Sequence, residues 1–224
     1  MILRIIGNSD LKLIIDTAWS QLTKILNVPN DLSQYLINVF KELEKALNTE
    51  ITVTIFITER YKGALIPTPE NPSISFSLPS PEVIINKTVK GWVDIRISFY
   101  TPRFSTQKEE YIVLLKIVGH ELFHMYLDLE FLKRASLTFS PGVYLVKPNN
   151  ELVEVEEAVA ESVSIILVKN ALSKETMAIL SLSKYARNHN PHVMNEVMSL
   201  GKVPQRILSI LVKGRGIISC SFLG

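Results

Sequence analysis

The spacing of apolar residues changes twice along the chain, and this constrains the fold more than any other feature. Up to residue 48 apolar side chains recur every three or four positions, which predicts one helix before Pro29 and a second that begins at Asn30 or Asp31. From residue 51 the spacing becomes two, and after Pro102 it returns to the helical one. Strands followed by helices indicate an α+β domain.

The middle of the chain has the pattern of β-strands. Apolar and polar residues alternate over 51–58 and 92–99, and 82–87 is predicted as a further strand. Five prolines between residues 61 and 81 predict a long surface loop there. Because one face of 92–99 is polar, we expect this strand at the outside of a small, mostly antiparallel sheet.

Helical spacing predominates in the second half of the chain. The predicted helices cover roughly 105–131, 150–169, 173–187 and shorter pieces within 192–213. We expect a helical N-terminal region over 1–50 and a main domain over 51–224, which together can form one compact unit.

Size and charge exclude several classes of protein. The 224 residues are 47% hydrophobic, which suffices for a sizeable core and excludes a disordered chain. With 24 basic and 22 acidic residues, the chain lacks the basic character of a dedicated nucleic-acid binder. From Lys169 onward eight residues are basic and two are acidic, which fits either a solvated surface or a site for an acidic partner.

Cysteine content and the N-terminal sequence bear on the compartment. The single cysteine, Cys220, cannot form an internal disulfide, and the first residues lack the features of a signal peptide. The apolar stretch 111–118 contains Lys116 and is far shorter than the ~20 residues that cross a membrane. We therefore expect a cytoplasmic protein without a membrane span.

Residues 120–124, which read His-Glu-Leu-Phe-His, carry the strongest chemical signal. Histidines four residues apart in a helix lie on one face, one turn from each other, so both imidazoles can reach one metal ion. Glu121 is displaced from them by about 100°, where a carboxylate can address a metal-bound water without being a ligand. A chance occurrence of this short pattern in an ordinary core helix is the alternative, so a third ligand is needed.

Two carboxylates in the same helix are weak candidates for the third protein ligand that catalytic zinc requires. Asp128 lies one turn beyond His124, where a straight helix points it along the axis, and a solvated or capping role fits it better. Glu130 stands at the position of the third metzincin ligand. That motif, however, requires histidine in its place and a glycine turn at Leu127.

The acidic segment 151–161 supplies better candidates. Glu154, Glu157 and Glu161 share one stripe of the predicted helix, whereas Glu156 lies about 100° away on another side. Acids in a first helical turn commonly compensate the helix dipole, which accounts for Glu154. Glu157 and Glu161 fall deeper, among small and apolar residues. Buried carboxylates are costly unless they are paired or coordinate a metal.

The two motifs together resemble the gluzincin zinc metallopeptidases, which include the thermolysin-like enzymes and the minigluzincins. The gluzincin pattern has HExxH on one helix and, on the next, a ligand glutamate followed four residues later by an aspartate. The resemblance implies that His120, His124 and Glu157 bind one zinc ion per chain and that Glu121 is the general base. Glu161 would then orient His120. Its position usually holds Asp, one methylene shorter.

The resemblance also implies a fold and an activity. We expect a zincin-like α+β domain with its sheet packed on an active-site helix and a glutamate helix, and with additional N- and C-terminal helices. The strand 92–99 would lie where peptide substrates bind. The expected activity is hydrolysis of peptide bonds in a peptide or protein substrate, by a zinc-bound water that Glu121 activates.

A second donor to the tetrahedral oxyanion is not defined by the sequence. Thermolysin-like enzymes use a tyrosine and a histidine for this purpose, and the available groups here are Tyr144, His189 and His192. Each is also explained as an exposed loop side chain.

Two alternatives to an active peptidase remain open. The chain could be a binding or regulatory protein with a zincin fold, acting on a specific partner. It could also be a latent peptidase whose zinc is covered by the N-terminal helical pair or by the tail with Cys220, since a thiolate is a good zinc ligand. The intact Glu121 argues against simple loss of catalysis.

Overall fold

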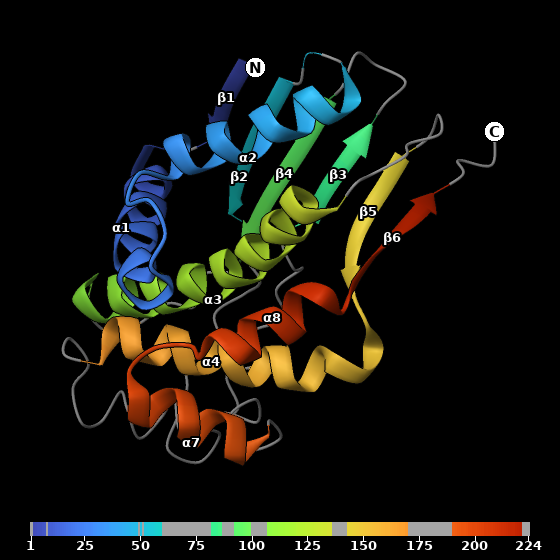
Figure 1. Cartoon of the computed structure of the whole chain (residues 1–224). Helices are drawn as coiled ribbons and strands as arrows, with labels where there is room; N and C mark the ends of the chain where they lie inside the picture. Colours follow the sequence, from blue (N-terminus) through green and yellow to red (C-terminus); the bar gives the residue numbers. More distant parts are fainter. Residues whose placement is uncertain are drawn as a thin grey trace.

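The structure is a computed structural model of the whole chain (Figure 1). It describes residues 2–7, 9–48, 50, 52–59, 82–86, 92–99, 107–135, 143–169 and 190–220. The predicted proline-rich loop and the helix predicted over 173–187 lie outside these residues. Among the described residues, no helix combines the length and the apolar character needed to cross a membrane.

The described elements form an α+β arrangement (Figure 1). In chain order they are β1 (Ile2–Gly7), α1 (Ser9–Leu26), α2 (Leu32–Leu47), β2 (Thr52–Glu59), β3 (Glu82–Asn86), β4 (Trp92–Phe99), α3 (Gln107–Arg134), β5 (Val143–Pro148), the 3₁₀ turn η1 (Asn150–Leu152), α4 (Val153–Val168), α7 (Pro191–Leu200), α8 (Gln205–Lys213) and β6 (Arg215–Cys220). The helices α1, α2, α3 and α4 and the strands β2, β3 and β4 confirm the elements that the apolar spacing predicts.

Local sequence explains where α2 begins and ends. Asp31 is its N-cap, and the carboxylate accepts a hydrogen bond from the backbone N–H of Gln34 at 2.9 Å. Asn48 ends it in the left-handed conformation, with φ 48°, which asparagine tolerates better than most residues. The tryptophan of α1, Trp19, donates its indole N–H to the carbonyl oxygen of Pro29, between the two helices.

The six strands that the structure describes form one mixed sheet in the order β1-β2-β4-β3-β5-β6. The pairs β1–β2 and β2–β4 are parallel, and the pairs β4–β3, β3–β5 and β5–β6 are antiparallel. The apolar spacing does not predict β1, β5 or β6. Each has only six residues, and β5 and β6 contain Pro148 and Gly216, so their strand conformation depends on distant partners in the sheet.

The strand β4 is correct as a strand, but the expectation that it lies at the outside of the sheet is wrong. It pairs with β2 along one side and with β3 along the other. An alternating pattern indicates that one face of a strand is polar. It does not indicate whether the hydrogen-bonding edges of the strand are free. Both backbone edges of β4 are therefore used within the sheet.

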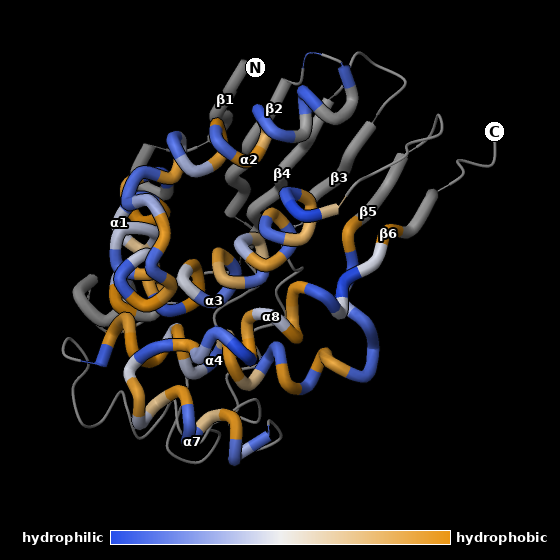
Figure 2. Tube along the Cα trace, viewed as in Figure 1, coloured by the Kyte–Doolittle hydropathy of each residue, from blue (hydrophilic) through white to orange (hydrophobic). Residues whose placement is uncertain are grey.

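Helix α3 is the central helix. It contacts β3 and β4 of the sheet as well as α1, α2, α4 and α8, and in Figure 1 it lies between the sheet and α4. Figure 2 shows apolar positions recurring along α1, α3, α4 and α8, the helices that supply much of the core. Because α3 is covered by other elements over most of its length, most of its described side chains are buried.

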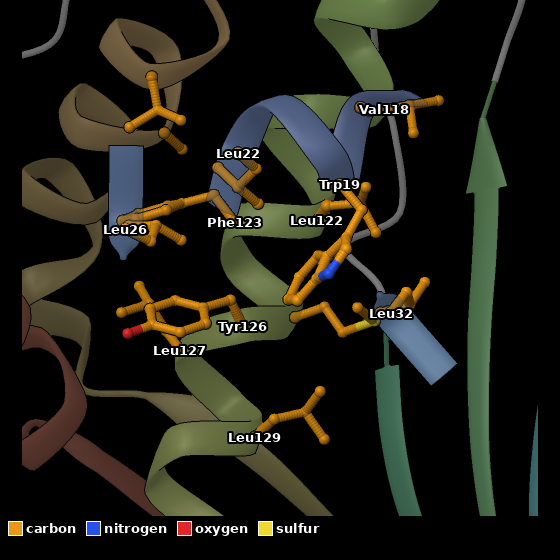
Figure 3. Packing of buried hydrophobic residues seen from close by; sticks show 14 of the residues in the cluster. Trp19, Leu22, Leu26, Leu32, Val118, Leu122, Phe123, Tyr126, Leu127 and Leu129 are labelled. Atoms are coloured by element: carbon orange, nitrogen blue, oxygen red, sulfur yellow. The ribbon is translucent and has the colours of Figure 1, made fainter. Parts of the chain in front are cut away.

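Large apolar side chains hold the N-terminal helices against α3. The largest fully buried ones are Trp19, Leu22, Leu36, Phe40, Leu122, Phe123 and Met125. Figure 3 shows Trp19 and Leu22 of α1 beside Leu122 and Phe123 of α3. Fully burying one such side chain contributes about 1.5–3 kcal/mol relative to leaving it in water. This packing fixes the position of α3, which carries the candidate site.

Candidate metal centre

Two helices bring His120, His124 and Glu157 together. The two histidines lie one turn apart on α3, with their Nε2 atoms 3.1 Å from each other. Glu157 projects from α4, with Oε2 at 3.2 Å from Nε2 of His120 and Oε1 at 3.5 Å from Nε2 of His124. Of the described residues, these three form a group that could hold a metal ion.

The spacing of these donor atoms fits a small tetrahedral ion. Bonds of about 2.0–2.1 Å to nitrogen and oxygen place any two ligands of a tetrahedral ion ~3.3 Å apart. The two Nε2 atoms are 3.1 Å apart, and they lie 3.2 and 3.5 Å from different oxygens of Glu157; with one atom per residue, the three donors lie within 4.8 Å of one another. Two imidazoles and one carboxylate are also a donor set that divalent transition metals accept.

Close packing of α3 on α4 makes this approach possible. A Cβ atom on Gly119, the residue before His120, would lie 2.2 Å from Cδ1 of Leu167 on α4. The space that Gly119 leaves beside His120 is thus filled by a side chain of the facing helix. On α4 the small residues Ala158, Ala160, Ser162 and Ser164 are fully buried.

Glu121 is buried beside the histidines and is only 4% exposed. Its Oε2 atom has no hydrogen-bond partner among the described residues. Burial raises the pKa of Glu121, and the nearby His120 and His124 act in the opposite direction. A carboxylate that is poorly solvated and weakly paired is a stronger proton acceptor than one in water.

Glu161 lies behind His120, as the resemblance implies. Its Oε2 is 3.6 Å from Nδ1 of His120, and both of its oxygens accept hydrogen bonds from Nζ of Lys116, at 2.7 and 2.8 Å. Burial by itself would raise the pKa of Glu161, but Lys116 and His120 hold it well below the usual range. The carboxylate is therefore ionised. The site also accommodates the extra methylene of glutamate relative to aspartate. Lys116 is a partner that sequence reasoning missed.

Glu156 has a role that sequence reasoning also missed. Its Oε1 lies 2.6 Å from Nδ1 of His124. Because a carboxylate accepts, Nδ1 donates, and a neutral His124 then has the lone pair of Nε2 available for a metal. Placing Glu156 on a different side from the site was wrong, because two adjacent carboxylates of α4, Glu156 and Glu157, reach different nitrogens of one imidazole.

Arg215 and Asp128 lie beyond Glu156 and connect it by hydrogen bonds to other elements of the fold. Arg215 donates from one terminal nitrogen to Oε1 of Glu156 at 2.5 Å and from Nε to Oδ1 of Asp128 at 2.6 Å. Asp128 is 5% exposed, so the expectation of a solvated or capping role is wrong. Burial raises the pKa of Asp128 to about 7, although Arg215 acts in the opposite direction.

The other candidate acids lie apart from this group. Glu154 is exposed on the first turn of α4, as expected for a residue that compensates the helix dipole. Glu130 is buried and accepts a hydrogen bond from the hydroxyl of Tyr35 at 3.0 Å, with Lys133 and Arg134 nearby.

The three candidate oxyanion donors are not joined to the site by any contact that the structure describes. Tyr144 belongs to strand β5, where its backbone is paired with Ile85 and Ser219, and not to a loop. His192 is exposed in the first turn of α7. His189 lies outside the described residues.

Four carboxylates near two imidazoles affect protonation in the metal-free protein. Burial by itself would lower the pKa of His120, but the contacts with Glu157 and Glu161 and the charge of Glu121 raise it to about 10. The metal-free site therefore holds a proton at His120 at neutral pH. A metal cation would supply positive charge at the same place and displace that proton.

Comparisons of the chain with models of known protein families, with curated proteins and with solved structures find no match. The chemistry of the site is therefore argued from its geometry.

The missed residues had only partial signals in the sequence. Lys116 interrupts an apolar stretch one turn before His120, and a lysine on the buried side of a helix requires an acidic partner. Glu156 is adjacent to the expected ligand and has no such distinguishing mark. Arg215 is far from the other residues in the sequence, so only the tertiary structure brings it to them.

Proposed function

We propose that the protein is a zinc-dependent metallopeptidase of the gluzincin type. His120, His124 and Glu157 would hold one zinc ion, and Glu121 would act as the general base. The observation that carries the proposal is a group of three donor atoms, one from each residue and all within 4.8 Å of one another, contributed by neighbouring helices. Glu121, buried and with an oxygen that lacks a described partner, lies on the same turn of α3.

The donor set of the site favours zinc over other common divalent ions. Two neutral imidazoles and one carboxylate form the three-ligand set that catalytic zinc takes, with the fourth position open to water. Calcium and magnesium prefer six or more oxygen ligands. When bound, zinc lowers the pKa of a water ligand to about 7 and polarises a carbonyl group.

In the proposed reaction Glu121 takes a proton from the attacking water and later gives it to the leaving amine. Burial raises the pKa of Glu121 above that of an ordinary glutamate, which makes its carboxylate a better proton acceptor for the first transfer. Glu156 faces Nδ1 of His124, and Glu161 faces Nδ1 of His120. These contacts keep the Nε2 atoms of both histidines directed at Glu157.

The proposal extends to a zincin-like fold. It is supported by an α+β arrangement in which the HExxH helix, α3, lies between a sheet and the glutamate helix, α4. Substrate binding by addition of a peptide to β4 is not part of the proposal, because both edges of that strand are paired.

Glu121→Gln tests the catalytic role. The amide keeps the shape of the side chain and leaves all three ligands in place, so zinc is retained while the proton acceptor is lost. We expect cleavage of an unfolded protein such as reduced, alkylated casein to fall by at least ~100-fold. Glu154→Gln, on the exposed face of α4, is the matched control and keeps full activity. Undiminished cleavage by zinc-loaded Glu121→Gln would contradict the mechanism.

The paired edges of β4 favour one second candidate, a zinc-binding regulatory protein without peptidase activity. An extended peptide needs a free strand edge to bind by strand addition, and β4 does not offer one. A parent protein that binds one zinc and cleaves no unfolded substrate would support this candidate over the peptidase.

A further inference from the structure

We propose that Arg215, the first residue of the C-terminal strand β6, is a positioning residue of the metal centre. It acts on Glu156, which in turn holds Nδ1 of His124. The inference rests on the proposed metal site and adds a residue from a part of the chain that the two ligand helices do not include.

The guanidinium group of Arg215 is buried and makes three hydrogen bonds. Its side chain is 0% exposed, and each of its three nitrogens donates to an oxygen. Nε donates to Asp128 on α3 at 2.6 Å, and the terminal nitrogens donate to Glu156 on α4 at 2.5 Å and to the carbonyl oxygen of Leu211 on α8 at 2.7 Å. A planar group held by three elements has no freedom to move independently of them.

One carboxylate oxygen connects Arg215 with His124. Oε1 of Glu156 accepts from Arg215 and also from Nδ1 of His124, at 2.5 and 2.6 Å. Oε2 of Glu156 has no hydrogen-bond partner in the described part of the chain. The orientation of this carboxylate therefore depends on Arg215 at one side and on the ligand histidine at the other.

Removing the guanidinium would disturb the site in two ways. Glu156 would lose the contact that fixes its side chain, so His124 would lose a fixed acceptor for Nδ1. Glu156 and Asp128 would also become two buried carboxylates that repel each other without a cation between them. Both effects act on the direction in which Nε2 of His124 points.

The arrangement on the other histidine supports this interpretation. His120 faces Glu161, which is bound by Lys116, so each candidate ligand histidine faces a carboxylate that is bound by a buried cation. Lys116 belongs to α3, the same helix as the histidine. Arg215 is 59 residues from Glu156 and 87 from Asp128, so it links β6 and α8 to the metal centre.

The test compares the zinc affinity of the full-length parent with that of Arg215→Met and Arg215→Lys, by competition with a chromophoric chelator at fixed pH. Methionine fills much of the buried volume without a charge, and we expect zinc binding about 10- to 100-fold weaker, the range for losing an outer partner of a ligand histidine. Arg206→Met removes an exposed arginine paired with Glu196 and is the matched control, with unchanged affinity.

A second background separates positioning from general packing. If Arg215 acts through Glu156, then Arg215→Met should weaken zinc binding far less in Glu156→Gln than in the parent. The ¹⁵N shifts of the His124 ring in the zinc-loaded protein supply an independent readout. We expect the Nδ1 signal to move in Arg215→Met and to stay in Arg206→Met.

The outcomes are distinct. A folded Arg215→Met with the zinc affinity and His124 signals of the parent overturns the positioning role and leaves the metal centre standing. Equal losses in the parent and Glu156→Gln backgrounds also overturn it. If Arg215→Met does not fold, Arg215→Lys decides: lysine keeps the charge but not the planar group with three donor nitrogens, so a zinc affinity and a His124 Nδ1 signal that both equal those of the parent refute the role of that group. A parent that binds no zinc refutes the metal centre itself, and the inference with it.

Discussion

The stability of the metal-free protein should fall as the pH rises, because of the proton on His120. Contacts with Glu157 and Glu161 raise the pKa of this imidazole from 6.5 to about 10 in the folded state. An unfolded chain has the ordinary value, so between these two pKa values the folded state binds a proton that the unfolded state has released. The stabilisation is complete below pH 6.5 and is lost as the pH approaches 10.

The magnitude follows from the two pKa values. One extra proton in the folded state changes the free energy of unfolding by about 1.4 kcal/mol per pH unit. Over the whole window the loss amounts to about 5 kcal/mol, which is comparable with the total stability of many domains. The side chain is only 16% exposed, so solvent screens the contacts little.

Other groups interfere little between pH 7.5 and 9.5. Burial raises the pKa of Asp128 to about 7, so this group has largely lost its proton at the lower limit. Burial also raises the pKa of Tyr35 and Tyr126 above the ordinary value of 10, which lies beyond the upper limit. Glu121 and Asp128 also have raised pKa values, so the contribution of His120 is isolated by comparison with a variant at this position.

The assay is urea unfolding followed by circular dichroism in the presence of a strong chelator, at several pH values in this window. The matched variant is His120→Asn, which has no titrating group at this position. We expect the free energy of unfolding of the parent to fall more steeply than that of the variant, by about 1.4 kcal/mol per pH unit. Equal slopes would refute the reasoning. With saturating free zinc the difference should disappear, because the metal takes the place of the proton.

Two further predictions concern the ligands and their surroundings. Glu157→Ala should lower zinc occupancy, measured by elemental analysis after dialysis, far more than Glu154→Ala on the exposed face of α4, and equal occupancy would contradict the ligand assignment. Lys116→Met removes the cation that donates to both oxygens of Glu161 and leaves only the more distant His120 beside this buried carboxylate, so we expect a loss of about 3–5 kcal/mol in urea unfolding, and a change below ~1 kcal/mol would contradict the importance of the Lys116–Glu161 ion pair.

Local sequence determined the features of this protein that depend on neighbours along the chain. The apolar spacing located the helices α1 to α4 and the strands β2 to β4, because burial of one face imposes a period on the sequence. The spacing of His120 and His124 determined that both imidazoles lie on one face, since a helix turns once in 3.6 residues. The depth of Glu157 and Glu161 in their helix indicated a paired or metal-binding role for both, and the resemblance to gluzincins selected Glu157, which lies beside the two histidines.

Tertiary structure decided everything that depends on which segments meet. The order of the sheet and the interior position of β4 follow from pairing between distant strands, which a period-two pattern does not specify. The same holds for Glu156, Arg215 and Asp128: burial of each charge required partners on other elements, and only the packing of α3, α4, α8 and β6 supplies them. The sequence could locate candidate metal ligands because a helix is a local structure. It could not locate the residues that hold the ligand in place, because their positions result from the free energy of the whole fold.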